Sequence, residues 1–320
     1  MPSVENLQHS PLTLKFKMEK TILIFDDDYL QNNALKKSLS ELLPGYQFEA
    51  YSTVSEIGYA LENRFFTLVI LNIRMDKSGI NGIEIISKIF ELNPIAHILL
   101  MSPDREIYDS ALATVLKTGK IIDIITKKVE ASHTAKLLEP IIINYYDRLS
   151  EDISILNTSL LQNYSDAKNE TDLHKKGVLF ERFICLFFGF LGYRDIQKRK
   201  IDLSRNELDL SIRNETKNPF LNKFGKYILI ECKNKPGYHI GKNDFIIFNT
   251  KLKNSSGLSE LGIIATTGGF AKTTYLEAMR ESGNSNKVLF LSNVEFIRLI
   301  QSDNKIEEFK KIIDEQHSTP

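Results

Sequence analysis

Short runs of consecutive apolar residues recur along the first half of the chain and alternate with longer stretches whose apolar positions have helical spacing. The runs predict strands at Thr21–Phe25, Tyr46–Tyr51, Thr67–Leu71, His97–Met101 and Ile121–Ile125. The longer stretches predict helices near residues 29–42, 54–63, 82–92, 105–117 and 132–146. Continuous apolar runs indicate strands that are covered on both faces. Residues 20–140 are therefore predicted to form an α/β domain with a doubly wound, five-stranded parallel sheet.

A stripe of apolar residues follows Pro140, with steps of three and four residues. It consists of Ile142, Tyr146, Leu149, Ile153, Leu156 and Leu160. This spacing predicts a linker helix within residues 141–170. The stripe has two interpretations: it packs on its own domain, or it pairs two copies of the chain in a homodimer. The polar segment Ser165–Asp172 predicts a hinge after it.

The order of predicted elements changes from about Leu173, which indicates a second domain over residues 171–320. Strands are predicted at Gln197–Leu203, Glu207–Ile212, Lys226–Lys233, Gly262–Thr266 and Lys287–Leu291, with helices before the first strand, near 243–254 and 271–281, and at the end. The resulting α-β-β-β-α-β arrangement predicts a mixed sheet.

Composition separates the two halves. The 320 residues include 42% hydrophobic and 26% charged residues, which is typical of a soluble globular protein, and the length suits two domains. The net charge is zero, which excludes a uniformly basic nucleic-acid binder. However, residues 1–170 carry 17 basic and 23 acidic side chains, whereas residues 171–320 carry 24 and 18. The basic second half predicts a polyanionic partner.

Several classes of protein are excluded by what the sequence lacks. Two cysteines, Cys185 and Cys232, are too few for a disulfide framework or a cysteine-rich zinc site. No stretch approaches the about 20 apolar residues of a membrane span. Residues 1–19 lack the apolar core of a signal peptide and predict a flexible tail. These features predict a cytoplasmic protein with no membrane partner.

Polar residues follow four of the five strands predicted in the first domain. Asp26-Asp27-Asp28 follows the first strand, Asn72 the third and Ser102 the fourth, and Lys127 comes just after the fifth. The carboxyl ends of the strands form the ligand crevice of an open α/β sheet. These residues therefore predict a site for Mg²⁺ or phosphate at one edge of the sheet.

With Asp26-Asp27, the segment ILNIRMDKSGINGIEII, Ser102 and Lys127, this domain resembles the receiver domain of two-component response regulators. The resemblance implies that Asp26 and Asp27 hold Mg²⁺, that the residue ending the third strand accepts a phosphoryl group, and that Ser102 and Lys127 contact the phosphate. Asn72 stands at the acceptor position, and a carboxamide has no nucleophilic carboxylate oxygen. We therefore expect a pseudo-receiver, kept for dimerisation or for docking a sensor kinase or regulatory protein; the alternative is a working phosphoacceptor.

Two carboxylates and a lysine form the candidate site of the second domain. The run Tyr227–Ile230 predicts a buried strand that ends in Glu231 and Lys233, whose side chains share one face. Asp209 lies in the preceding strand, and antiparallel pairing would place it near Glu231. Two carboxylates beside an ammonium group predict a Mg²⁺ site for phosphodiester hydrolysis. The lysine would orient or deprotonate the attacking water, or offset charge on phosphorus.

This second domain resembles the PD-(D/E)xK nucleases, in particular the restriction-endonuclease-like branch related to Mrr. The similar segments are Phe180-Glu181, Leu191-Gly192-Tyr193, Glu207-Leu208-Asp209, Glu231-Cys232-Lys233 and GIIATTGGF. The resemblance implies that Asp209, Glu231 and the backbone carbonyl of Cys232 bind Mg²⁺, or Mn²⁺ as a substitute. It also implies that Lys233 is catalytic and that Glu181 supports the metal or the lysine. For Glu181, an exposed position on an amphipathic helix is the alternative.

Basic residues near this site predict contacts with DNA phosphates: Lys198, Arg199, Lys200, Lys242 and Lys251. The alternative for each is an ordinary solvated position. Together these features predict a Mg²⁺-dependent deoxyribonuclease, regulated or assembled through its receiver-like domain and acting in defence against foreign DNA. The competing interpretation is a non-cleaving regulator that binds DNA or protein through a degenerate nuclease fold, in a two-component-type pathway.

Overall fold

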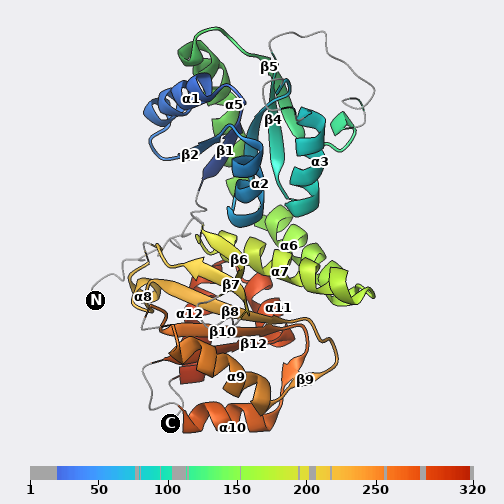
Figure 1. Cartoon of the computed structure of the whole chain (residues 1–320), viewed down its shortest axis with the longest axis vertical. Helices are drawn as coiled ribbons and strands as arrows, with labels where there is room; N and C mark the ends of the chain where they lie inside the picture. The colour runs from blue at the N-terminus through green and yellow to red at the C-terminus, as the bar shows by residue number, and fades with distance from the viewer. Residues whose placement is uncertain are drawn as a thin grey trace, which may run out of the picture.

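A computed structural model describes residues 20–75, 79, 81–93, 95–102, 113, 115–151, 153–193, 195–201, 207–216, 218–255, 258–281 and 286–317. The chain forms two α/β units along its long axis, with helices between them (Figure 1). The predicted tail and most of the predicted helix 105–117 lie outside the described residues. Across the ranges given, no helix is both long and apolar enough to cross a membrane.

The first unit is a parallel sheet covered by helices on both faces, as predicted. Its strands are β1 (Thr21–Phe25), β2 (Gln47–Tyr51), β3 (Leu68–Asn72), β4 (His97–Ser102) and β5 (Ile121–Thr126), in the order β2-β1-β3-β4-β5. Its helices are α1 (Tyr29–Leu42), α2 (Val54–Asn63), α3 (Gly82–Leu92) and α5 (Ala131–Glu151). Apolar residues of α2 and α3 pack on one face, and those of α1 and α5 pack on the other.

The apolar stripe predicted as one linker helix is divided between α5 and α6 (Ile153–Asn169). Ile142 and Tyr146 are buried in the core of the first unit, whereas Leu156 and Leu160 are buried in the core of the second. The interpretation that the stripe pairs two copies is wrong for these four side chains, because each is already buried within one chain. The side chain of Ile153 lies outside the described part.

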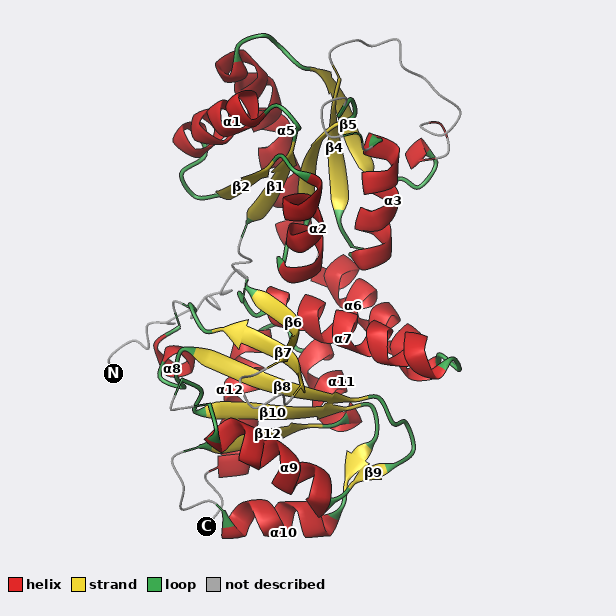
Figure 2. Cartoon of the chain, in the orientation of Figure 1, coloured by secondary structure: helices red, strands yellow, loops and turns green. Residues whose placement is uncertain are grey.

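The second unit is a mixed sheet between two helical layers (Figure 2). Its strands are β6 (Ile196–Ile201), β7 (Glu207–Arg213), β8 (Tyr227–Lys233), β10 (Leu261–Thr266) and β12 (Lys287–Leu291), with a small separate pair of β9 (His239–Ile240) and β11 (Gly269–Phe270). The sheet order is β12-β10-β8-β7-β6, in which β6, β7 and β8 are antiparallel and β8, β10 and β12 are parallel.

The helices of the second unit pack on both faces of this sheet. They are α7 (Leu173–Phe190), α8 (Pro219–Asn222), α9 (Lys242–Lys253), α10 (Lys272–Arg280), α11 (Asn293–Gln301) and α12 (Lys305–His317). The larger core lies between the sheet and α6, α7, α11 and α12, and it contains a cluster of phenylalanines. The smaller core lies on the opposite face, under α9.

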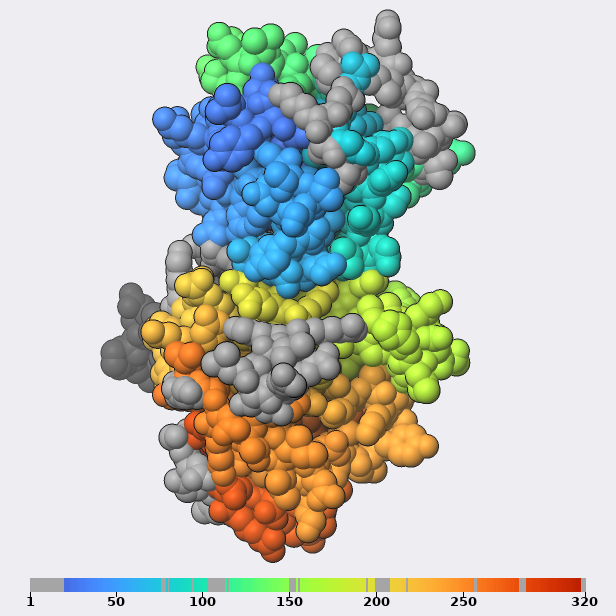
Figure 3. Space-filling view, in the orientation of Figure 1, coloured from blue at the N-terminus to red at the C-terminus, as the bar shows by residue number. Residues whose placement is uncertain are grey.

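Side-chain packing joins the two units, and the surfaces of α2 and β6 meet in the space-filling view (Figure 3). Phe65, between α2 and β3, is buried in the core of the second unit and packs edge-on against Phe190. A Cβ at Gly189 of α7 would lie 1.9 Å from the Phe65 ring, so only glycine admits this ring. Arg64 forms an ion pair with Asp195, with an Nη1–Oδ1 distance of 3.0 Å.

Candidate functional site

Two carboxylates and two lysines gather on one face of the second sheet. The antiparallel register pairs Leu210 with Ile230, so the next step along the strands sets Asp209 opposite Glu231. Lys233 Nζ donates to Glu231 Oε1 at 2.8 Å. Lys251 Nζ, which comes from α9, donates to Glu231 Oε2 at 3.1 Å. The structure thus brings together the three residues predicted to form the metal and catalytic site, and it places beside them Lys251, which was predicted to contact DNA.

The electrostatics of this cluster differ between the two carboxylates. Asp209 Oδ2 accepts a hydrogen bond from the backbone N–H of Cys232 at 2.7 Å. Burial, and then the neighbouring charge of Glu231, raise the pKa of Asp209 above its usual range. Burial acts to lower the pKa of Lys233, but the hydrogen bond and charge of Glu231 outweigh it and raise that pKa. The lysine is therefore held in its charged form, while the ionised form of Asp209 is disfavoured.

The residues present fit a hard divalent cation. In the described ranges, no three His, Cys, Asp or Glu side chains lie close enough to hold an ion together. Asp209 and Glu231 supply two carboxylates, and Mg²⁺ is commonly held by one or two carboxylates while water and phosphate oxygens complete its shell. A carboxylate whose charge is destabilised by burial and by a neighbouring carboxylate is also one that a cation would stabilise.

Glu181 lies on α7 and faces the strand that carries the site. Its side chain is partly buried. The thiol of Cys232, the residue between Glu231 and Lys233, has a pKa raised well above its usual value by burial, by Asp209 and then by Glu181. Glu181 therefore lies near the Cys232 thiol, which packs in the core on the α7 side of the sheet, and its role in supporting the metal or the lysine stays a prediction.

Two of the residues predicted to contact DNA have partners within the chain. Lys251 is bound to Glu231, and its side chain is only 15% exposed. Lys198 lines a cavity of about 30 Å³ between the two units, and its backbone N–H donates to Asn63 Oδ1 at 3.4 Å. The ammonium group of Lys251 is thus engaged within the cluster, whereas only the backbone N–H of Lys198 is bonded, and the contacts of both lysines with DNA stay predictions. The side chains of Arg199 and Lys200 lie outside the described part.

Exposed lysines instead surround the sheet edge at which β8 and β10 end. Backbone hydrogen bonds from Gly269 to Tyr238 and from Ala271 to Ile240 set the starts of α9 and α10 side by side. Lys242 and Lys272 are the first residues of these helices, and Lys235 lies in the turn after β8. All three are exposed, and none takes part in the ion pairs found within the described ranges. Of these three, only Lys242 was singled out from the sequence.

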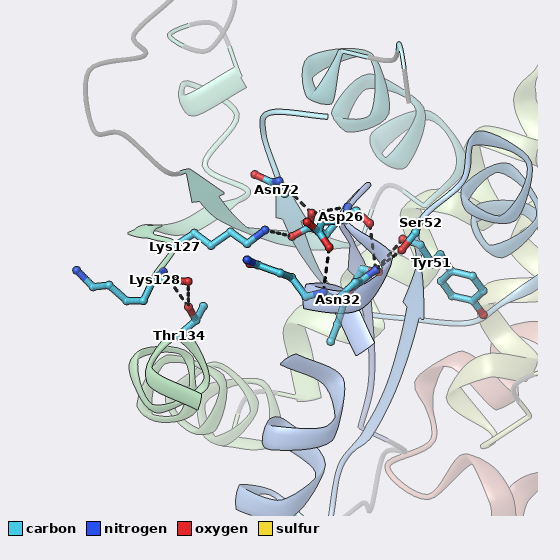
Figure 4. Close-up of polar contacts among 11 residues, drawn as sticks. Asp26, Asn32, Tyr51, Ser52, Asn72, Lys127, Lys128 and Thr134 are labelled. Carbon is cyan, nitrogen blue, oxygen red and sulfur yellow. Dashed lines mark hydrogen bonds and ion pairs between the residues drawn. The ribbon is translucent and has the colours of Figure 1, made fainter. Parts of the chain in front are cut away.

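The first unit has its own polar cluster at the carboxyl ends of β1, β3 and β5 (Figure 4). Asp26 is buried, and its Oδ2 lies 2.5 Å from Lys127 Nζ. Asn72 Nδ2 donates to Asp26 Oδ1 at 3.2 Å, and the backbone N–H of Asp28 donates to the same oxygen. Ser102 is buried at the end of β4, and its carbonyl accepts from the N–H of Lys127. Lys127 thus pairs its positive charge with one oxygen of Asp26, and Asn72 donates a hydrogen bond to the other.

Asn32 belongs to this cluster, although sequence reasoning did not identify it. Its Nδ2 donates to the carbonyl of Tyr51 at 2.9 Å and to Ser52 Oγ at 3.1 Å, and it also reaches the carbonyl of Asp26. These hydrogen bonds therefore hold α1 against the carboxyl ends of β1 and β2. The available signal was a polar residue on the buried face of α1, three positions before Leu35.

Comparison with known proteins identifies the first unit. Residues 22–139 match the family model of the response regulator receiver domain, so this part of the chain is a receiver domain, as the sequence predicted. A search of the curated proteins finds no match for the chain.

Similar solved structures cover the same part of the chain. A CheY-like receiver domain protein from Methanospirillum hungatei is 22% identical and covers 41% of this chain and 98% of its own, with a TM-score of 0.33. An adenylate cyclase structure from Rhodopirellula baltica is 20% identical and covers 45% and 98%, with a TM-score of 0.35. The response regulator TrrA from Thermotoga maritima, in complex with Mg²⁺ and BeF, is 24% identical and covers 38% and 98%, with a TM-score of 0.30.

Proposed function

We propose that the second unit is a Mg²⁺-dependent deoxyribonuclease and that the receiver domain regulates it. The observation that carries this proposal is the placement of Asp209 opposite Glu231 on neighbouring strands, with Lys233 bound to Glu231. A buried sheet face has no structural need for two opposed carboxylates, and their mutual repulsion is a cost that a divalent cation would remove. Restriction-type chemistry against foreign DNA is the role we propose.

Each residue of the cluster has a distinct task in this proposal. Asp209 and Glu231 would hold Mg²⁺, which when bound supplies polarisation of a phosphoryl oxygen and activation of water. Lys233 has a raised pKa and so remains protonated at neutral pH. It is therefore suited to stabilise charge that develops on the phosphoryl oxygens, rather than to take a proton from water. Mn²⁺ is expected to substitute for Mg²⁺ because it prefers similar oxygen ligands.

The surroundings of the cluster suit a nucleic-acid backbone. Lys235, Lys242 and Lys272 present exposed ammonium groups at the sheet edge where the site strand ends. Such groups bind phosphates without reading sequence, and they release counterions when they do so. We therefore propose that DNA approaches the site across this edge, and not across β6.

Replacement of Lys233 by alanine tests the proposed chemistry. We expect the wild-type protein to cut plasmid DNA with Mg²⁺ and not with EDTA, and Lys233→Ala to cut at least about a hundredfold more slowly, because one positioned charge is lost. Agarose-gel time courses measure the rates. Lys253→Ala, which removes a partly exposed lysine paired with Glu281, is the matched control and should cut normally. A wild-type protein that binds DNA with Mg²⁺ and never cuts it would favour the non-cleaving regulator.

We also propose that the receiver domain does not form an acyl phosphate at residue 72. Asn72 ends β3 beside Asp26, but its carboxamide lacks the nucleophilic oxygen that phosphoryl transfer requires. Its Oδ1 is buried and has no hydrogen-bond partner within the described part of the chain. Together with the carboxylates of Asp26 and Asp27, this oxygen fits a hard cation. The domain would then act through contacts with a sensor kinase or another regulatory protein.

Restoring a carboxylate at this position tests the proposal about the receiver domain. Incubation with acetyl phosphate should leave the wild-type protein unmodified and should add a phosphoryl group to Asn72→Asp, because only the variant carries a nucleophile there. Phosphate-affinity electrophoresis distinguishes the two forms. Ser102→Ala, which leaves residue 72 unchanged, serves as an unmodified control. A phosphorylated wild-type protein would contradict the proposal.

A further inference from the structure

We infer that Lys251 is a positioning residue that holds Glu231 in the metal-free protein and withdraws when a divalent cation binds. The inference rests on the proposed function, since it concerns the same metal site. Both oxygens of Glu231 are occupied by ammonium groups, Oε1 by Lys233 at 2.8 Å and Oε2 by Lys251 at 3.1 Å. A cation that binds Glu231 must therefore compete with a lysine for one of these oxygens.

The fold brings Lys251 to the site from a different element. Helix α9 packs on the sheet through Phe248 and Leu252, which are buried on either side of Lys251 in the helix. Gly262 of β10 permits this close approach, because a Cβ there would lie 2.7 Å from the Phe248 ring. The aliphatic stem of Lys251 is thereby covered, and its ammonium group reaches across β10 to Glu231 on β8.

The charges of the cluster explain why one lysine has to leave. Asp209 and Glu231 carry two negative charges, and Lys233 and Lys251 carry two positive charges, so the metal-free cluster is balanced. A divalent cation added to this arrangement would face two ammonium groups at short range and in partly buried surroundings, where repulsion is poorly screened. Withdrawal of one lysine reduces this repulsion and frees one oxygen of Glu231.

Lys251 is the lysine that the geometry allows to leave. Lys233 lies two residues from Glu231 on the same strand, at the shorter distance of the two, and the pairing with Glu231 raises its pKa. Lys251 comes from a separate element, α9, and its distance to Glu231 is the longer of the two, so it is the weaker competitor for the carboxylate. In the metal-free state the ammonium group of Lys251 thus occupies the Glu231 oxygen that a cation would bind, and it keeps the carboxylate in place.

The test is the affinity for Mg²⁺ alone, measured by titration calorimetry without DNA. Lys251→Met keeps the apolar stem and removes the charge. We expect it to bind Mg²⁺ about two- to fivefold more tightly than the wild type, as the loss of one competing ion pair predicts. Without Mg²⁺, the variant should unfold at a lower temperature, because Glu231 loses one of its two partners. Lys251→Arg should restore the wild-type affinity.

Lys253→Met is the matched control for this experiment. It removes a lysine two positions further along α9 that pairs with Glu281, and it should leave the Mg²⁺ affinity unchanged. A folded Lys251→Met protein that binds Mg²⁺ as the wild type does, or more weakly, would overturn the inference and leave the proposed nuclease intact. A wild-type protein that binds no Mg²⁺ at the cluster would overturn both.

Discussion

Replacing Asp209 by asparagine should abolish DNA cleavage and at the same time stabilise the metal-free protein at neutral pH. Burial and the charge of Glu231 raise the pKa of Asp209 in the folded state above its value in the unfolded chain. A carboxyl group of this kind contributes stability below its unfolded pKa and loses it as the pH rises through the folded pKa. At neutral pH the ionised Asp209 is therefore a destabilising group, and an uncharged amide in its place removes that cost.

Urea unfolding at two pH values measures this effect. At pH 7, without Mg²⁺, Asp209→Asn should have the larger free energy of unfolding, because the amide oxygen still accepts the hydrogen bond from Cys232. Below about pH 3 the aspartate is protonated in both the folded and the unfolded state, and the two proteins should converge. Cleavage by the variant should fall by at least about a hundredfold. A variant that is less stable than the wild type at pH 7 would show that Asp209 has a structural role.

Glu231→Gln is the informative comparison, because it should have the opposite effect on stability. Glu231 is nearly buried and accepts hydrogen bonds from both Lys233 and Lys251. An amide in its place removes the carboxylate to which both ammonium groups are directly bonded, and partly buried charges that lose such a partner are destabilising. We therefore expect the uncharged amide to raise the free energy of unfolding at position 209 and to lower it at position 231.

Adding one methyl group at Gly189 should separate the folding of the two units. The new Cβ would lie 1.9 Å from the ring of Phe65, so the ring has to leave its position on α7. We expect Gly189→Ala to lose about 1–3 kcal/mol of stability, which is typical of overpacking in a core. Calorimetry should then resolve two unfolding transitions in place of one, because Phe65 and Phe190 no longer pack together.

Gly177→Ala on the same helix provides the control for this prediction. Gly177 has no atom within 4 Å of the position that a Cβ would take. Alanine there should leave the two units coupled and should stabilise α7 by about 0.5–1 kcal/mol, as expected for glycine replaced within a helix. A single, unshifted transition in Gly189→Ala would show that Phe65 does not couple the units.

Much of the fold could be predicted from the sequence because strands and helices have local signatures. The apolar run at Thr21–Phe25 and the stretch near 29–42 match β1 and α1 at both ends. Helix α1 begins where the side chain of Asp28 accepts a hydrogen bond from the N–H of Gln31, a signal that is also local. In contrast, β9 and β11 have two residues each, and such short strands show no periodicity.

The features of the fold and of the site that could not be predicted depend on contacts between residues far apart in the sequence. The spacing of the apolar stripe could not show that Tyr146 and Leu156 enter different cores, since the spacing is the same in α5 and in α6. Likewise, the opposed carboxylates follow from strand register, but the binding of Lys251 to Glu231 depends on how α9 crosses the sheet. The position of a lysine in the sequence does not show which carboxylate it will bind.

The contact between the two units affects how a fragment without the receiver domain should behave. β6 is an outer strand of its sheet, and the N–H of Lys198 on it is satisfied by Asn63 from the receiver domain. A fragment that begins at α6 would leave this N–H of the outer strand without its partner and would lack the aromatic ring that fills the space above Gly189. Open strand edges and uncovered apolar surfaces promote self-association. We therefore expect the fragment to be less soluble than the whole chain.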